Sequence, residues 1–362
     1  MKFVVNNTDL SYAVNATCKA ADKDGGITVI ANKDKVTFVT NNKILTIETT
    51  IKAEVFEDGK ATVPAKIFLN TVSKISSSDI TISAEEDSAQ VSFKYDTGEL
   101  KIAVLGNDYS AYIKNDKVSS GFEIKFAEFK KIVEVISRYA STDNSRPALA
   151  GVNVKSIGDL LIVTGCDGYK LAQRTVDTAQ LNKEQKDINI IVPVQTLQTV
   201  YSLIDKKAEK MQLSLANDDK LFVFEQDGLK ITSALIGGQY IETSRIIPTQ
   251  FQGSVTADKT ALSQSIERST ITGSEMVILD IDEASIAVSS NSESGMLNET
   301  VKATTEGNTF DMAFNAKWLL EMFKNCDEDN VTMSLTGKIS PMIIKEDKQL
   351  FLLLPIRRAE GK

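Results

Sequence analysis

Histidine is absent from the 362 residues, which removes the commonest general base and the commonest metal ligand of proteins. Only three cysteines occur, Cys18, Cys166 and Cys326, and no CxxC pair is present. We therefore expect reduced thiols in a cytoplasmic protein rather than a disulfide framework. No apolar run approaches the ~20 residues of a membrane span, and no signal-peptide pattern opens the chain. The length suits two or three domains, and 42% hydrophobic and 25% charged residues are typical of a globular protein.

Sequence motifs for catalysis are also missing. The chain has no GxGxxG, no GxxxxGK[ST], no GxSxG and no cluster of cysteine ligands, so we predict no catalytic residue and no cofactor. The best carboxylate group is Asp280, Asp282 and Glu283 in LDIDEA. On a strand, Asp280 and Asp282 would face the same way and could hold Mg²⁺. A strand that runs into a solvated turn explains the pattern more simply, and we predict no metal site.

One helical pattern occurs three times. Residues 63–75, 192–204 and 314–326 each place apolar residues at i, i+3, i+4 and i+7, the stripe of a helix with one buried face. Pro64 and Pro193 fit the first helical position of two copies, because proline has no N–H to leave unpaired there. A strand-like tetrad of alternating apolar and polar residues follows each copy. Because the copies are 129 and 122 residues apart, we interpret them as repeated domains.

A second helix belongs to each repeat, over about 8–21, 126–140 and 257–270. Short strand patterns lie between the helices, and polar stretches near 115–120 and 237–253 read as linkers. Two helices with one apolar face each must cover one side of a sheet. We therefore predict an α+β fold with domains at 1–120, 121–250 and 251–362.

The charge is distributed unevenly. The net charge is −8, but the six helical segments carry twelve basic and only seven acidic residues. An acidic body with basic helices suits a protein that presents one surface to a polyanion. Ordinary solvated helix faces explain the count equally well.

Four further motifs complete the pattern, namely VPAK at 63–66, CDGYKLA at 166–172, GGQY with RIIP at 237–248, and LLLPIRR at 352–358. Together with the three repeats, they resemble the bacterial DNA polymerase III beta subunit, the sliding clamp family, across the whole chain. The resemblance implies three repeated DNA-clamp domains, each with two helices packed on antiparallel sheet, in a head-to-tail dimer ring. The helices would surround duplex DNA, and binding would be independent of sequence because phosphate contacts carry no base information. The implied role is a non-catalytic processivity factor that binds the DNA polymerase III catalytic subunit, an ATP-driven clamp loader and other proteins with clamp-binding motifs.

The resemblance also implies three sets of site residues. A hydrophobic pocket for partner peptides, between the second and third domains, would use Leu149, Cys166, Gly168, Tyr169, Lys170, Leu171, Ile241, Arg245, Ile246, Pro341, Leu352, Leu353, Leu354, Pro355, Ile356 and Arg357. The cations expected to face DNA are Lys19, Lys66, Lys74, Lys130, Lys131, Arg138, Arg146, Lys206, Lys259, Arg268 and Lys317. The expected dimer edges include Leu100, Ile102, Ser269 and Ile271.

Within the C-terminal run, an ordinary buried strand accounts for Leu352 and Leu354, so Leu353 and Ile356 are the residues we expect to face a peptide. Three alternatives stay open at this point. The protein could be a divergent second clamp, an adaptor with the clamp fold that does not encircle DNA, or a metal-dependent enzyme that uses the LDIDEA carboxylates.

Overall fold

The computed structural model describes residues 1–42, 44–85, 89–106, 118–143, 145–177, 179–180, 188–204, 207, 209–216 and 220–358. The chain forms two compact units. Unit 1 consists of Met1–Lys130, Thr178–Lys186 and Gln195–Leu235. Unit 2 consists of Lys131–Asp177, Asp187–Val194 and Ile236–Lys362.

Six α-helices lie in the described residues: α1 (Asn7–Thr17), α2 (Ala65–Lys74), α3 (Phe126–Glu134), α4 (Val194–Leu203), α5 (Lys259–Ile271) and α6 (Ala316–Asn325). The repeated stripe is the buried face of α2, α4 and α6, where Phe68, Leu197 and Leu319 are at most 3% exposed. The prediction for proline is wrong by one position. Pro64 precedes α2 because it still pairs with Gly26 as the last residue of β6, and Pro193 likewise ends β15.

Unit 1 contains a five-stranded sheet in the order β5-β1-β7-β8-β9 and a nine-stranded sheet in the order β14-β10-β16-β17-β18-β4-β3-β2-β6. All these pairings are antiparallel. The strands of the first sheet are β1 (Lys2–Asn6), β5 (Glu54–Glu57), β7 (Asp79–Ser83), β8 (Gln90–Tyr95) and β9 (Gly98–Ala103). Those of the second are β2 (Gly26–Asn32), β3 (Lys35–Asn41), β4 (Leu45–Lys52), β6 (Gly59–Pro64), β10 (Val118–Lys125), β14 (Ala179–Gln180), β16 (Lys210–Ala216), β17 (Leu221–Gln226) and β18 (Leu229–Ala234).

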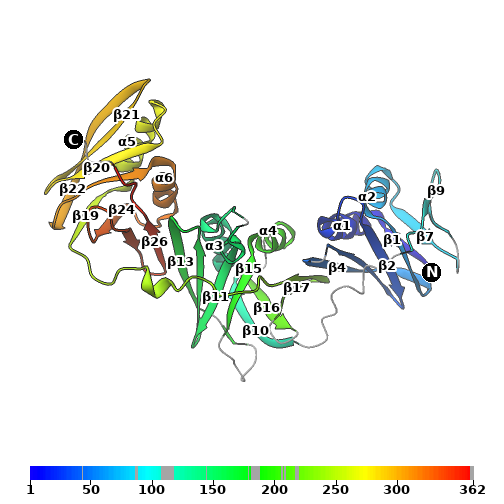
Figure 1. Ribbon diagram of the computed structural model, residues 1–362. Coiled ribbons are helices and arrows are strands. Elements are labelled where there is room, and N and C mark those ends of the chain that lie inside the picture. The colour runs from blue at the N-terminus through cyan, green and yellow to red at the C-terminus, as the bar shows by residue number, and fades with distance from the viewer. Residues whose placement is uncertain are drawn as a thin grey trace. The chain divides into compact units, whose positions relative to one another are not determined.

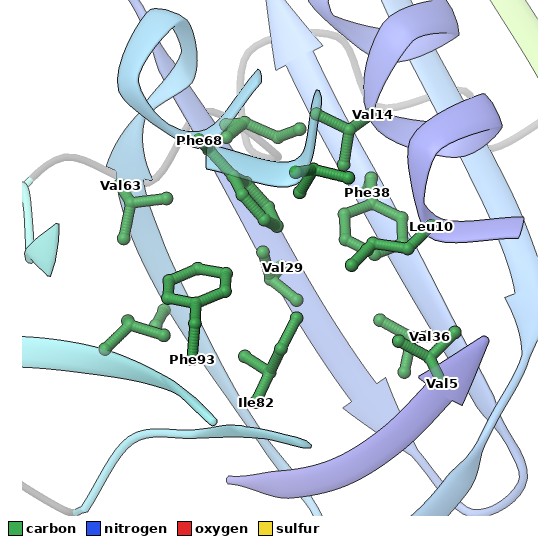
Figure 2. Packing of buried hydrophobic residues seen from close by; sticks show 14 of the residues in the cluster. Val5, Leu10, Val14, Val29, Val36, Phe38, Val63, Phe68, Ile82 and Phe93 are labelled. Atoms are coloured by element: carbon green, nitrogen blue, oxygen red, sulfur yellow. The ribbon is translucent and has the colours of Figure 1, made fainter. Parts of the chain in front are cut away.

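Aromatic side chains form the centre of the first core in unit 1 (Figure 2). Phe68 from α2 lies between Phe38 of β3 and Phe93 of β8, with ring centroids 6.0 and 5.1 Å away. All three rings are fully buried. Burial of one such side chain contributes about 1.5–3 kcal/mol, so the helical stripe is what holds α2 on the strands.

Unit 2 contains one continuous set of twelve strands in the order β15-β11-β12-β13-β26-β25-β24-β19-β22-β21-β20-β23. Their bounds are β11 (Gly151–Ile157), β12 (Leu160–Cys166), β13 (Lys170–Asp177), β15 (Asn189–Pro193), β19 (Gly253–Asp258), β20 (Met276–Ile281), β21 (Ser285–Ser292), β22 (Gly295–Gly307), β23 (Asp311–Asn315), β24 (Asn330–Leu335), β25 (Met342–Lys345) and β26 (Gln349–Leu353). In Figure 1, β13 and β26 lie side by side, as their antiparallel pairing requires. Three short 3₁₀ turns, η3 (Ile136–Tyr139), η4 (Pro147–Ala150) and η5 (Thr243–Arg245), complete this unit.

The three cysteines are free thiols. Within the described residues, no helix combines the length and the apolar character that crossing a membrane needs.

Candidate functional site

Two strand junctions join segments that the repeats place in different domains. In unit 1, β4 pairs with β18 from Leu45 opposite Ser233 to Thr49 opposite Leu229. In unit 2, β13 pairs with β26 from Lys170 opposite Leu353 to Arg174 opposite Gln349. The second junction carries a cavity.

The cavity has a volume of about 230 Å³. It is lined by Cys166, Gly168, Tyr169, Lys170, Leu171, Ile241, Ile246, Pro341, Leu352 and Leu354. Every one of these residues belongs to the set that the resemblance predicted for the peptide pocket. They come from the β12–β13 hairpin, the segment before β19, the loop before β25 and the end of β26, so the strand junction is what brings them together.

The floor of this pocket is apolar. Leu171 and Leu352 stand directly opposite each other across the β13–β26 junction, and both are at most 4% exposed. Burial raises the pKa of the Cys166 thiol, so this side chain is neutral. Tyr240, Ile246 and Ile247 from the segment before β19 pack against this floor. The floor of the pocket is therefore suited to contact with apolar side chains.

A tight turn shapes the mouth of the pocket. The Asp167 carboxylate accepts hydrogen bonds from the backbone N–H of Tyr169 and of Lys170, both at 2.8 Å. Gly168 sits at φ 96°, a left-handed conformation that glycine adopts without strain. The turn leaves Tyr169 57% exposed, with its ring centroid 5.9 Å from that of Trp318 on α6. Sequence reasoning missed Trp318, because nothing local relates it to a turn about 150 residues earlier.

Lys170 is buried, and its charge is compensated from behind the pocket. Its Nζ lies 2.8 Å from a carboxylate oxygen of Glu321 and donates to the Arg138 carbonyl at 3.1 Å. The same ammonium stands 4.8 Å from the centre of the Tyr139 ring, within cation–π range. The ammonium of Lys170 thus interacts with groups of α6 and η3, on the side of the sheet opposite to Leu171.

The prediction that Leu353 faces the pocket and Leu354 the core is wrong, because the structure shows the reverse. Leu353 is 1% exposed and does not line the pocket, whereas Leu354 is half-buried and does. The reason is the alternation of a strand, because Leu352 already faces the pocket and its neighbour Leu353 must face the opposite side. Leu354 then returns to the pocket, and its N–H donates to the Tyr169 carbonyl at 2.9 Å.

The other predicted pocket residues lie outside the cavity lining. Leu149 is buried in η4, and Arg245 is exposed beside the lining residue Ile246. Pro355, Ile356 and Arg357 follow β26, which ends at Leu353. Ile356 is 39% exposed, and its N–H donates to Ala313 of β23 at 2.7 Å. These residues are therefore candidates for the rim of the pocket rather than its floor.

Ion pairs already engage several of the cations predicted to face DNA. Lys131 pairs with Asp327 at 2.5 Å, and Arg268 makes a two-pronged pair with Glu299 at 2.6 Å. The two hydrogen bonds from Arg268 lower the pKa of Glu299 to about 2, so this carboxylate is ionised. Neutralised cations are weaker candidates for phosphate contact.

The remaining cations differ in their surroundings. Lys66, Lys74, Lys130 and Arg138 are exposed, Lys19 donates to Ser202 at 2.9 Å, Lys259 donates to the Cys326 carbonyl at 3.0 Å, and Lys317 lies 3.5 Å from Glu275. Lys206 lies outside the described residues. Arg146 is exposed, and its guanidinium lies 3.0 Å from where a Cβ on Gly168 would stand. The structure thus puts Arg146 at the edge of the pocket.

A second hollow, which we call the helix groove, lies along α5 and α6. Its volume is about 720 Å³. It is lined by Arg138, Lys259, Thr260, Ser263, Gln264, Glu267, Lys317, Trp318, Leu320, Glu321, Phe323 and Lys324. Four cations against two carboxylates make it a basic surface.

The predicted dimer-edge residues divide into two pairs. Leu100 is 37% exposed and Ile271 is 81% exposed, whereas Ile102 and Ser269 are buried. In the described residues, β9, which carries Leu100, is the last strand of its sheet, and Ile271 is the last residue of α5.

The LDIDEA carboxylates do not lie on one strand face. Asp280 belongs to β20, whereas Asp282 lies in the turn to β21, where its N–H donates to the Ser285 carbonyl at 2.9 Å. In the described residues, no group of three or more His, Cys, Asp and Glu side chains could hold a metal ion.

Comparisons with known proteins agree with this architecture. Models of the N-terminal, central and C-terminal domains of the DNA polymerase III beta subunit match residues 1–112, 123–242 and 244–352. The chain belongs to the DNA polymerase III beta subunit family. Beta sliding clamps of Staphylococcus epidermidis and Staphylococcus aureus are each 25% identical over 382 aligned residues, which cover 99% of both chains.

Solved members of the beta subunit family share the fold of this chain. The DNA polymerase sliding clamp of Bacillus subtilis superposes with a TM-score of 0.90 at 23% identity, over 99% of this chain and 100% of that one. The sliding clamp of Caulobacter crescentus also gives 0.90, at 21% identity and the same coverage. The three-repeat fold predicted from the sequence is therefore confirmed.

Proposed function

We propose that this beta subunit is a sliding clamp that closes with a second copy, head to tail, into a ring around duplex DNA. It acts as a non-catalytic processivity factor for DNA polymerase III in the cytoplasm. The polymerase catalytic subunit and other partners dock through the pocket, and an ATP-driven loader opens the ring. The domain bounds at 1–120, 121–250 and 251–362 remain part of this proposal.

The observation that carries the ring is a pair of unused strand edges. Each repeat supplies two equivalent edge strands. The first is β4, β13 or β22 in repeats one, two and three, and the second is β9, β18 or β26. Two of the three sets are joined within the chain, β4 to β18 and β13 to β26. In the described residues, β9 and the N-terminal half of β22 have no strand on their outer side. A contact between unlike ends closes into a ring if its rotation closes, and each copy would supply both ends.

The internal junctions also predict the register of the third. In both junctions, the first residue of one strand lies opposite the fifth residue of the other. Leu45 of β4 lies opposite Ser233 of β18, and Lys170 of β13 lies opposite Leu353 of β26. The same rule places Gly295 opposite Ile102 of the partner subunit. Leu297 then stands opposite Leu100 of the partner subunit, which buries two apolar side chains against each other.

An exposed apolar side chain and a hollow that could receive it support this closure. Ile271, at the end of α5, is the most exposed large apolar side chain of the described residues. Lys19 occupies the same place in the first repeat, and it reaches Ser202 on α4. By repetition, Ile271 would reach α2 of a second copy, where a hollow of about 360 Å³ is lined by residues that include Ile67, Ile75 and Leu100.

The oligomeric state tests the closure. We expect light scattering to give a dimer for the wild type and a monomer for Ile271→Asp, because a desolvated carboxylate would face an apolar hollow. Ile157→Asp is the matched control, since Ile157 is 52% exposed on the β11–β12 hairpin, and it should leave the dimer intact. A wild-type monomer at micromolar concentration contradicts the ring.

Retention on circular DNA tests the function itself. After loading, a closed ring should stay on nicked circular plasmid through gel filtration at high salt and should be lost when the plasmid is linearised, because it slides off the ends. Equal retention on both forms would indicate ordinary binding, and no retention on either would favour an adaptor that does not encircle DNA.

A further inference from the structure

The pocket and the helix groove share one wall in unit 2. Tyr169 and Lys170 line the pocket, whereas Trp318 and Glu321 line the groove. The two pairs touch, because the Tyr169 and Trp318 ring centroids are 5.9 Å apart and the Lys170 and Glu321 charges are 2.8 Å apart. The wall is therefore only two side chains thick.

The chemistry of the groove favours a chain of phosphates. Arg138, Lys259, Lys317 and Lys324 outnumber the carboxylates of Glu267 and Glu321, and they still do when the exposed Glu275, 3.5 Å from Lys317, is counted. Thr260, Ser263 and Gln264 add side-chain hydrogen-bond donors along the same hollow. Cations and neutral donors in a row are what nucleic-acid backbones meet in proteins.

The wall has little free charge that could screen an anion in the pocket from an anion in the groove. Lys170 is its single buried cation, and the Glu321 carboxylate and the Arg138 carbonyl already share its ammonium. An anion in the pocket and an anion in the groove would thus repel each other across protein, where screening is weaker than in water.

We propose that the helix groove binds the phosphate backbone of DNA, and that this occupancy weakens the binding of acidic peptides, but not of uncharged ones, in the pocket. The inference rests on the proposed function, since it assigns the groove to the DNA-facing side. Acidic partners would then bind the pocket more weakly once DNA is present, whereas uncharged, apolar partners would bind equally well before and after. For two unit charges about 10 Å apart at an effective dielectric constant of about 20–40, the repulsion amounts to roughly a fourfold to sixteenfold change in affinity.

The linkage must be reciprocal. If DNA weakens an acidic peptide by a given factor, the peptide must weaken DNA by the same factor, because both describe one coupling free energy. This equality distinguishes coupling from simple competition for one site, in which each ligand excludes the other completely.

The experiment uses the full chain and two fluorescent peptides with the same apolar anchors, one flanked by aspartate and one by asparagine. Anisotropy gives each affinity with and without a saturating short DNA duplex at low salt. Trp318 is the only tryptophan, so its emission in a titration with DNA alone, without peptide, reports occupancy of the groove. We expect the aspartate peptide to bind at least threefold more weakly with DNA, the asparagine peptide to be unchanged, and the difference to shrink as salt is added.

Groove variants complete the test. Lys317→Gln with Lys324→Gln should abolish the effect of DNA on the aspartate peptide, and the affinity of the asparagine peptide without DNA should stay unchanged. The matched double variant Lys155→Gln with Lys302→Gln removes two exposed charges from β11 and β22 and should keep the coupling. Equal behaviour of the two peptides, or coupling that survives in the groove variant, overturns the proposal. A ring that is retained on circular DNA but shows neither Trp318 response nor coupling leaves the clamp function standing and refutes this inference alone.

Discussion

The β4–β18 junction of unit 1 and the β13–β26 junction of unit 2 share their backbone and differ in their side chains. Both pair five residues on each strand in the same register. Before both junctions, a side-chain oxygen of Asn42 or Asp167 accepts hydrogen bonds from the backbone N–H groups two and three residues later. Assembly of the repeats therefore depends on main-chain pairing that many side chains permit.

One cross-strand pair accounts for much of the difference. Leu171 and Leu352 form the apolar floor of the pocket, and the matching positions in unit 1 are Thr46 and Thr232. Thr46 accepts a hydrogen bond from Asn41, so its position is polar although it is buried. A buried apolar pair leaves a surface that gains by contact with another apolar group, whereas a hydroxyl pair costs free energy when water is removed. The comparison indicates that the pocket is a local addition to a general junction.

The largest expected effect comes from copying the threonine pair into the pocket. Leu171→Thr with Leu352→Thr should weaken a peptide with apolar anchors by more than about a hundredfold, because anchors in desolvated pockets carry most of such binding energy. Fluorescence anisotropy measures the loss, and a circular dichroism melt checks the fold. Ile246→Ala with Leu354→Ala is a milder variant that should lose at least about tenfold. Wild-type affinity in this milder variant would mean that the pocket is placed wrongly.

The buried cation is the next point of difference, because Lys170 corresponds to Leu45 in unit 1. Lys170→Leu should lower the free energy of unfolding by about 2 kcal/mol, since Glu321 is left half-buried without its partner. The double variant with Glu321→Leu should recover most of this loss, because an apolar pair can replace an ion pair. Urea unfolding measures both. A double variant as unstable as the single one would show that the charge pair itself stabilises the junction.

A smaller gain is expected from unit 1. In the described residues, the buried hydroxyl of Thr232 has no hydrogen-bond partner. Thr232→Val keeps the shape and removes the unsatisfied group, so it should raise the free energy of unfolding by about 1 kcal/mol. Thr46→Val should do the opposite, because it removes the hydrogen bond that the Asn41 amide donates to the Thr46 hydroxyl. Loss of stability in Thr232→Val would point to a bound water at this hydroxyl.

The smallest effect concerns Glu48, which stands opposite Lys230 in the same junction. Burial raises the pKa of Glu48 above its ordinary value of 4.5, with Lys230 opposing and Glu225 adding to the shift. The folded state thus favours the protonated acid, and ionisation costs stability as the pH rises through that value. Glu48→Gln should therefore stabilise the protein at pH 7, by roughly 0.5 kcal/mol, and the gain should vanish below the ordinary pKa. Thermal melts across this range measure it, and a gain that is constant with pH would contradict the burial argument.

Local periodicity determined much of this protein. The apolar stripe of Phe68, Leu197 and Leu319 predicted three equivalent helices, because burial of one helix face requires that spacing whatever else surrounds it. The collinear motifs then indicated the clamp family and the set of residues that gather around Leu171 and Leu352. Both kinds of signal are written along the chain and need no knowledge of distant contacts.

Only the tertiary structure decided which members of that set meet. Alternation along β26 says that Leu353 and Leu354 face opposite sides, but the pairing of β26 with β13 chooses the side that faces the pocket. Trp318 joins Tyr169, and Asp327 neutralises Lys131, across sequence separations of 149 and 196 residues. Such contacts depend on how strands from different repeats are registered, and no local pattern of residues encodes that register.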